Sequence, residues 1–239
     1  MKQQGKISKG KWSQYLFAKL NESFFKKIFH DLFFRNILVL KMLGISVPIL
    51  DKKLPYGMNY GDLTTYLLGR KLSGLVRERK MTRVHEIGIG QYGILCIYLK
   101  NRFPQLVISG STISSEQIVN SSRVALKNSC SINFFLADVL DRVEGTFDMI
   151  WWNLPYYELE VLSFIGRLFR QIKEQSSLVP GGLVLLGFNS VPLNADLVKK
   201  ILDRYHYLEI ESVDRFFWNP HIVLAIKYCP DNVKTRLDQ

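Results

Sequence analysis

The sequence predicts an α/β fold built around a mostly parallel sheet, and three observations lead to that fold class. After Arg83, short apolar runs alternate with longer helical stretches, which is typical of a parallel sheet with crossover helices. A glycine-rich segment separates the first apolar run from the first helical stretch. The last two apolar runs follow each other without room for a helix, so we expect them to pair as an antiparallel hairpin.

The composition indicates one large globular domain with a small appendage. The 239 residues are 47% hydrophobic and 22% charged, which excludes a disordered chain. There is no heptad or Gly-X-Y repeat and no long uncharged apolar window, so coiled-coil, collagen-like and membrane-spanning structures are not expected. The three cysteines lack the spacing of a zinc site or a disulfide framework, and no secretory signal is recognisable. We therefore expect a cytoplasmic protein without a metal.

The first region, residues 1–80, is predicted to be a basic, aromatic helical extension that recognises the substrate or caps its pocket. Apolar side chains, many of them aromatic, recur at helical spacing in its first half, with lysines between them. Pro48 and Pro55 end this pattern, and a further helix is expected to begin at Asp62 or Thr64. Two interpretations stay open for the lysine-bearing helices. They either pack an aromatic face on the main domain or bind a polyanion or a membrane surface.

The second region, residues 81–239, carries the predicted sheet. Apolar runs bounded by turn residues are expected as strands over residues 83–87, 106–111, 132–137, 147–152 and 183–188. Stretches with one apolar face are expected as helices over residues 92–101, 115–129, 160–175 and 194–205. The hairpin strands are expected over residues 207–213 and 221–227.

The net charge of +11 is concentrated in the N-terminal part of the chain. Up to His85 there are 17 basic and 5 acidic residues (net +12), and after it there are 15 basic and 16 acidic residues (net −1). A clustered basic surface gains affinity for nucleic acid by releasing counterions from phosphates. The charge therefore bears on what the first region contacts, and the neutral sheet region has to be interpreted from its motifs.

Residues 86–93 (EIGIGQYG) follow the first predicted strand and open the first predicted helix. Gly88 and Gly90 allow a tight turn with close approach of a ligand to the backbone, and a helix N-terminus offers N–H groups there. His85 precedes this segment within the strand, and we expect it to be a buried histidine with satisfied hydrogen bonds instead of a catalytic base.

Four segments in this order resemble the motifs of class I S-adenosylmethionine-dependent methyltransferases, over roughly residues 83–228. Residues 84–93 look like the glycine motif, and residues 135–140 look like the segment whose aspartate, here Asp138, recognises the adenine amino group. Residues 151–157 (WWNLPYY) resemble the Asn-Pro-Pro-Tyr signature of enzymes that methylate nitrogen, and residues 179–186 resemble the Pro-Gly-Gly turn before the fifth strand. The resemblance implies a Rossmann-like seven-stranded sheet with a C-terminal antiparallel hairpin, and S-adenosyl-L-methionine as the cofactor.

The resemblance also implies roles for individual residues. Cofactor binding falls to residues at the ends of the first four strands: Glu86, Gly88, Gly90, Tyr92, Thr112, Asp138, Val139 and Asn153. Catalysis falls to Asn153, Pro155 and Tyr156, whereas Tyr60, Tyr157 and Trp218 are expected to line the substrate pocket or to form a lid.

The chemistry of Asn153 also follows from the residue itself. An amide or base amine is a poor nucleophile because its lone pair is delocalised, so it has to be oriented toward the methyl group. The Asn153 side-chain carbonyl can accept a hydrogen bond from the substrate N–H, Pro155 fixes the loop, and Tyr156 offers a flat face for stacking.

Two positions depart from the family pattern. The second strand ends at Thr112 where the family has an acidic residue that holds the ribose hydroxyls, and Ser111 or Glu116 are the other candidates for that contact. A hydroxyl binds the diol more weakly than a carboxylate does. Leu154 replaces the first proline of the signature, which keeps the backbone carbonyl and adds freedom.

The sequence therefore favours an enzyme that methylates an amide or amine nitrogen, with RNA or protein as substrate. One alternative is a small-molecule enzyme that methylates an amine, or that cyclises the cofactor and releases methylthioadenosine. A further alternative is an RNA-binding protein without catalysis.

Overall fold

The computed structural model describes residues 43–44, 63–154, 161–190, 193, 195–215 and 220–230. Its elements in chain order are α3 Leu63–Arg79, β1 Arg83–Ile87, α4 Ile94–Arg102, β2 Val107–Thr112, α5 Ser115–Lys127, β3 Asn133–Leu136, β4 Phe147–Asn153, α6 Val161–Glu174, β5 Leu178–Asn189, α7 Ala195–Leu202, β6 Leu208–Arg215 and β7 His221–Tyr228. The helices predicted in the first half of the N-terminal region lie outside the described residues.

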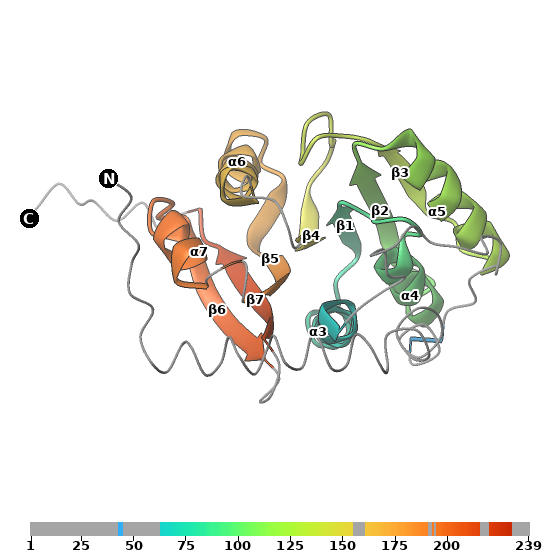
Figure 1. Cartoon of the computed structure of the whole chain (residues 1–239), viewed down its shortest axis with the longest axis horizontal. Coiled ribbons are helices and arrows are strands. Elements are labelled where there is room, and N and C mark those ends of the chain that lie inside the picture. Colours follow the sequence, from blue (N-terminus) through green and yellow to red (C-terminus); the bar gives the residue numbers. More distant parts are fainter. Residues whose placement is uncertain are drawn as a thin grey trace, which may run out of the picture.

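The seven strands form one sheet in the order β3-β2-β1-β4-β5-β7-β6 (Figure 1). β7 runs antiparallel to both of its neighbours, and the other pairs are parallel. This confirms the predicted fold class and the C-terminal hairpin. The strand order reverses between β1 and β4, and in open α/β sheets ligands bind at the carboxyl edge beside such a point.

Helices cover both faces of the sheet. In β4, Met149 and Trp151 belong to a core cluster with α3, α4 and α5, whereas Ile150 and Trp152 belong to a second cluster with α6 and α7. This alternation follows from the two-residue period of a strand. Helix α3, although within the predicted N-terminal extension, is part of the first cluster and packs directly on the sheet.

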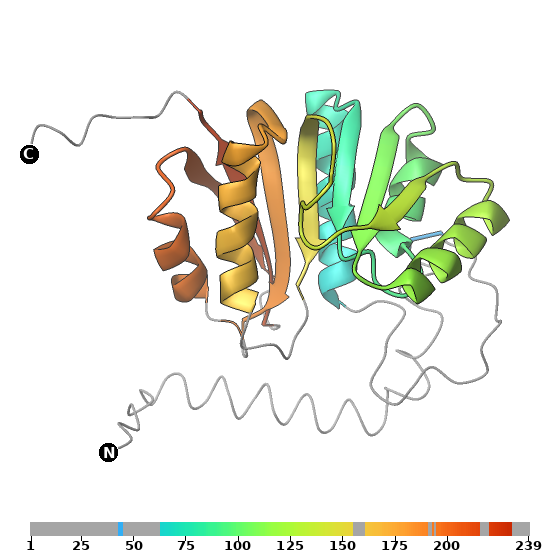
Figure 2. The same cartoon turned by 90° about the horizontal axis from the view of Figure 1, so that it is seen from above.

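The chain crosses from β3 to β4 without a helix. Residues 137–146 form turns and irregular backbone, and in Figure 2 this connection runs on the same face of the sheet as α6, with α7 on the far side of α6. Leu140 and Val143 of the connection are buried in the same cluster as α6. One half of this face is therefore covered by helices, and the other half is crossed by a loop.

Strand β5 differs most from its prediction, because it begins at Leu178 instead of residue 183. Phe147 pairs with Leu178 and Met149 pairs with Leu183, so the predicted Pro-Gly-Gly turn is an irregularity inside the strand. Gly181 has a φ of +78°, and a Cβ on Gly182 would lie 2.8 Å from the carbonyl oxygen of Val179. The two glycines allow the strand to absorb the extra residues without ending.

No helix in the described part of the chain is both long and apolar enough to cross a membrane.

Candidate functional site

The predicted site residues that the structure describes come from the ends of β1, β2, β3 and β4, at the carboxyl edge of the sheet. Ile87 of β1 pairs with Trp152 of β4, so the glycine loop that starts at Gly88 begins beside Asn153. These loops lie beside the point at which the strand order reverses.

The glycine loop is shaped by its own backbone. Gly88 and Gly90 have φ of +64° and +61°, a region that side chains with a Cβ rarely adopt. The N–H groups of Gly88 and Ile89 both donate to the Ser111 carbonyl oxygen, at 2.8 and 3.2 Å, which ties the loop to the end of β2. A Cβ on Gly88 would lie 2.9 Å from Nε1 of Trp152, whereas a Cβ on Gly90 would meet nothing within 4 Å. The loop is thus closed on its sheet side and open at Gly90.

Helix α4 begins directly after this loop. Its N-cap is Gly93, with a φ of 58°, and no side chain caps the helix. A Cβ on Gly93 would lie 2.8 Å from the ring of Phe134. Tyr92 is buried in the first core cluster, so the structure places this predicted cofactor residue within the packing beneath the loop.

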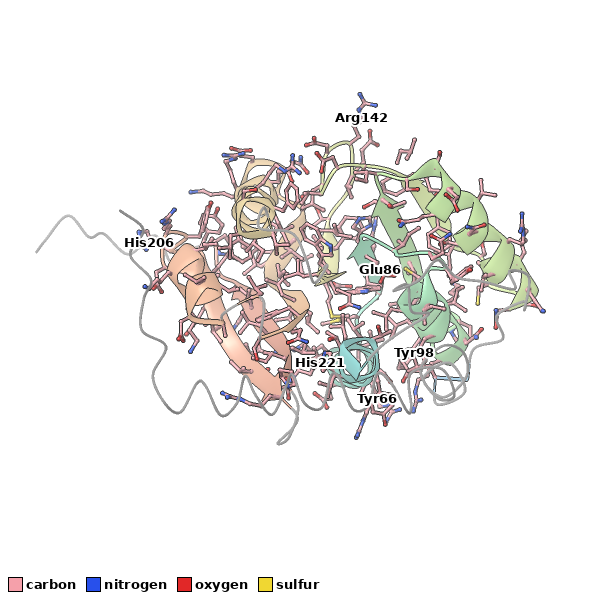
Figure 3. All side chains as sticks on the ribbon, in the orientation of Figure 1. Tyr66, Glu86, Tyr98, Arg142, His206 and His221 are labelled. Atoms are coloured by element: carbon pink, nitrogen blue, oxygen red, sulfur yellow. The ribbon has the colours of Figure 1, made fainter. Side chains whose placement is uncertain are left out.

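Glu86 supports the glycine loop from inside the protein. Its side chain is buried between β1 and α4, and it accepts a hydrogen bond from the Cys96 thiol at 2.9 Å (Figure 3). Burial raises the pKa of Glu86 to about 7, although the hydrogen bonds from Cys96 oppose this shift. Burial and the neighbouring carboxyl group likewise raise the pKa of the Cys96 thiol.

His85 points to the opposite face of the sheet from Glu86. Its Nδ1 lies 2.9 Å from the Ser109 hydroxyl and its Nε2 lies 3.0 Å from the Ser111 hydroxyl. Burial, with a smaller effect of the Arg83 charge, lowers its pKa to about 3. The prediction of a buried, satisfied histidine is confirmed.

The end of β2 shows where the three candidate ribose contacts lie. Ser111 is fully buried against His85, and Thr112 is buried, with its hydroxyl donating to Oε1 of Gln117 at 2.5 Å. Glu116 is exposed on α5, where it accepts a hydrogen bond from Gln91 of the glycine loop at 3.2 Å. Of the three, Glu116 is the carboxylate, and it already contacts the loop.

Ile113 was not predicted as a site residue, and its side chain is 78% exposed at this edge. An apolar side chain directly after a strand that ends at this edge is a signal that could have identified it. It leaves an apolar surface exposed there.

Asp138 follows β3 in the helix-free connection, and its carboxylate is engaged by a partner that the sequence did not indicate. Nη1 of Arg167 donates to Oδ2 at 2.9 Å and Nη2 donates to Oδ1 at 2.6 Å. Val139 has a φ of 59°, which is uncommon for a β-branched residue, and its side chain is buried. Arg142, further along the connection, points away from the protein (Figure 3).

Asn153 ends β4 and is held by α3. Its Nδ2 donates to the Thr65 hydroxyl at 3.2 Å, whereas its Oδ1 is buried and finds no partner among the described residues. The neighbouring Thr64 hydroxyl is hydrogen-bonded to Nδ1 of His221, which Figure 3 shows beside α3. A Cβ on Gly187 would lie 2.8 Å from Thr64 and 3.4 Å from Oδ1 of Asn153, so this glycine lets α3 approach the strand ends.

The remaining predicted residues, Tyr60, Pro155, Tyr156, Tyr157 and Trp218, lie outside the described residues. The structure therefore brings together the glycine loop, the end of β2, the Asp138 turn and Asn153. Three groups lie along this edge: the glycine loop with its positive φ angles, the half-exposed carboxylate of Asp138 and the buried amide oxygen of Asn153.

Comparisons with known proteins agree with this arrangement. The profile of a family described as the methyltransferase small domain matches residues 56–213. The ribosomal RNA small subunit methyltransferase C of Pasteurella multocida is 28% identical over 145 residues, which cover 60% of this chain and 42% of that protein. The chain spans less than half the length of the curated relatives it matches.

Two solved structures resemble the fold. A methyltransferase from Pyrococcus furiosus has a TM-score of 0.57 at 18% identity and covers 92% of this chain and 98% of that chain. The ribosomal protein L11 methylase from Lactobacillus delbrueckii subsp. bulgaricus has a TM-score of 0.54 at 23% identity and covers 68% of this chain and 79% of that chain. At these identities the likeness concerns the fold alone.

Proposed function

This chain belongs to the methyltransferase small domain family of class I S-adenosylmethionine-dependent methyltransferases, and from that membership we propose that it methylates an amine nitrogen of an RNA base. The observation that carries the proposal is the unpartnered Oδ1 of Asn153. A buried amide oxygen without a hydrogen bond is costly, and such groups in folded proteins call for an explanation. One explanation that fits a methyltransferase is that this oxygen accepts a hydrogen bond from an N–H of the substrate.

Asn153 is suited to orient a base amine. Its Nδ2 is fixed on Thr65, so the side chain keeps its oxygen as the remaining group. An acceptor for one N–H of the substrate aligns the nitrogen without removing its proton, which is what a delocalised amine requires. Because α3 supplies Thr65, the helix before β1 takes part in setting the geometry.

The residues of the edge fit S-adenosylmethionine. Gly90 leaves open space at the glycine loop, which a Cβ would enter, and the half-exposed carboxylate of Asp138 has lone pairs for an amino group. Ile113 offers an apolar surface for a planar ring, and Glu116 or Thr112 would hold the ribose. When bound, the cofactor supplies an electrophilic methyl group on a sulfonium sulfur.

Two observations support RNA as the substrate. The curated relative from Pasteurella multocida is named as a ribosomal RNA methyltransferase. The first 85 residues carry 17 basic and 5 acidic residues, a density of positive charge that favours phosphate contacts. We assign methyl transfer to the sheet region of residues 81–239 together with α3, which supplies Thr65, and we assign substrate recognition to the part of the chain before α3.

The test is turnover of the full chain with methyl-labelled S-adenosylmethionine and three substrate pools: small-subunit ribosomal RNA, protein extract and metabolites. We expect labelled RNA and S-adenosylhomocysteine. Asn153→Ala should lower kcat by about 100-fold, since misplacing a reacting group by about 1 Å has an effect of this size. Thr65→Val, which removes the anchor of Nδ2, should give a smaller loss of kcat.

Asn128→Ala is the matched control, because the Asn128 side chain caps the end of α5 through a 2.9 Å hydrogen bond to the Val124 carbonyl, away from the site. It should keep wild-type turnover. Full turnover in Asn153→Ala would refute the assigned role. Labelled protein or labelled metabolite would refute RNA methylation in favour of methylation of that substrate. Release of methylthioadenosine would refute it in favour of cyclisation of the cofactor.

A further inference from the structure

Two side chains of α6 hold the turn that carries Asp138, and we refer to this pair, Arg167 and Gln171, as the α6 clamp. Arg167 binds the Asp138 carboxylate through two hydrogen bonds of 2.6 and 2.9 Å. One helical turn later, Oε1 of Gln171 accepts from the Leu140 N–H at 3.2 Å, and its Nε2 donates to Oδ1 of Asp141 at 2.5 Å. The spacing of four residues puts both side chains on one face of the helix.

The turn depends on contacts from outside itself. Residues 137–146 contain no helix, and Val139 adopts a positive φ that a β-branched residue avoids. Such a conformation persists when the surroundings determine it. Gln171 is buried, and it satisfies the backbone N–H directly after Val139. The clamp is therefore placed to impose the conformation of this turn.

Arg167 is itself held by an aromatic contact that leads back to the glycine loop. Its Cζ lies 5.2 Å from the ring centroid of Phe164, and the Phe164 ring lies 6.4 Å from that of Trp152. The indole of Trp152 is the group that a Cβ on Gly88 would strike. A continuous set of contacts thus runs from Gly88 to Asp138.

We propose that Arg167 is a positioning residue that determines specificity for the 6-amino group of the cofactor's purine, an inference that rests on the proposed cofactor site. Arg167 presents a planar fork, and two parallel hydrogen bonds fix the plane of the Asp138 carboxylate. Each carboxylate oxygen keeps a lone pair away from the fork, and the side chain is 52% exposed, so these lone pairs remain accessible. They suit an N–H donor and oppose a carbonyl oxygen at the same position.

The test compares binding of S-adenosylhomocysteine with binding of S-inosylhomocysteine, whose purine carries an oxygen in place of the amino group. Calorimetry on the full chain requires no RNA, so it is independent of the substrate. Arg167→Gln should weaken the binding of S-adenosylhomocysteine about 10-fold. The dissociation constant of S-inosylhomocysteine divided by that of S-adenosylhomocysteine should fall by a similar factor. Arg167→Lys keeps the charge and loses the fork, so it should fall between the wild type and Arg167→Gln.

Arg170→Gln is the matched control on the same helix, because Arg170 is exposed and pairs with Glu174 at 3.8 Å. It should bind both ligands as the wild type does. Equal weakening of both ligands by Arg167→Gln would reduce Arg167 to a structural role, and tighter binding would show that it competes with the purine for Asp138. Either result overturns the proposal. Absence of binding by the wild type would instead refute the cofactor site.

Discussion

The glycine loop after β1 and the Asp138 turn after β3 reach the same edge of the sheet, but they are held there in different ways. The glycine loop is fixed by its own backbone, with two glycines at positive φ and two N–H groups on the Ser111 carbonyl. The Asp138 turn has no glycine at its strained position and is held by side chains of α6. The first region is thus held by backbone groups, and the second is held by side chains of another helix.

The largest effect is expected from a change that fills the glycine loop. In Gly88→Ala the new Cβ would lie 2.9 Å from Nε1 of Trp152, a buried indole, and the residue would keep a φ of +64°. Backbone strain and overpacking together should lower the free energy of unfolding by about 3 kcal/mol. Calorimetry should show that S-adenosylhomocysteine binding is lost, and a urea titration should show the loss of stability.

Gly181→Ala is the control for this prediction. Gly181 also has a positive φ, of +78°, but the nearest atom to its Cβ would be Cε of Lys227 at 4.0 Å. It should cost about 1 kcal/mol of stability through strain alone and leave the affinity for S-adenosylhomocysteine unchanged. Equal affinities in both variants would mean that the shape of the loop is not what the cofactor requires.

The next effect concerns the stability of the protein as a function of pH, to which the two faces of β1 contribute oppositely. Glu86 lies under the glycine loop with a pKa raised to about 7, so its stabilising contribution is complete below pH 4.5 and is lost as the pH rises through 7. His85 lies on the other face with a pKa lowered to about 3, so its contribution is complete above pH 6.5 and is lost as the pH falls. From pH 7 to 5, each changes the free energy of unfolding by about 2 kcal/mol, with opposite signs.

The wild type should therefore show little change in urea midpoint between pH 7 and pH 5 from these two groups. Glu86→Gln removes the stabilisation that Glu86 gives at low pH, so this variant should be less stable at pH 5 than at pH 7. His85→Gln removes the destabilisation that His85 causes at low pH, so this variant should be more stable at pH 5 than at pH 7. Each variant serves as the control for the other. Parallel pH profiles for the two variants would contradict the opposite shifts of the two groups.

Features that depend on residues close together in the sequence could be predicted. The bounds of β1, residues 83–87, coincide with those predicted, because the strand is followed at once by glycines that can turn the chain at positive φ. The buried state of His85 was predicted as well, since a residue inside a strand of a doubly covered sheet has no access to water. The hairpin at the end of the sheet followed from the absence of room for a crossover helix.

Side-chain contacts between residues far apart in the sequence could not be predicted. Asp138 and Arg167 meet because α6 lies against the connection after β3, and no local pattern reveals that approach. The hydrogen bond from Asn153 to Thr65 joins residues 88 positions apart. A polar side chain on a helix has the same sequence signature whether it faces water or a neighbouring turn, so these contacts become visible only in the folded chain.

The last effect tests the support of the Asp138 turn by α6 directly. Gln171→Ala removes both hydrogen bonds to the turn and leaves the Leu140 N–H without its acceptor in a buried site, which should lower the free energy of unfolding by about 2 kcal/mol. Hydrogen exchange should show lost protection at Leu140, while the amides of Gly88 and Ile89 stay protected. The control is Gln175→Ala, since Gln175 lies exposed directly after α6 and its side chain contacts the Ser177 hydroxyl at 3.4 Å instead of the turn. Because the glycine loop keeps its own hydrogen bonds, loss of protection in both regions would mean that the two share one source of support.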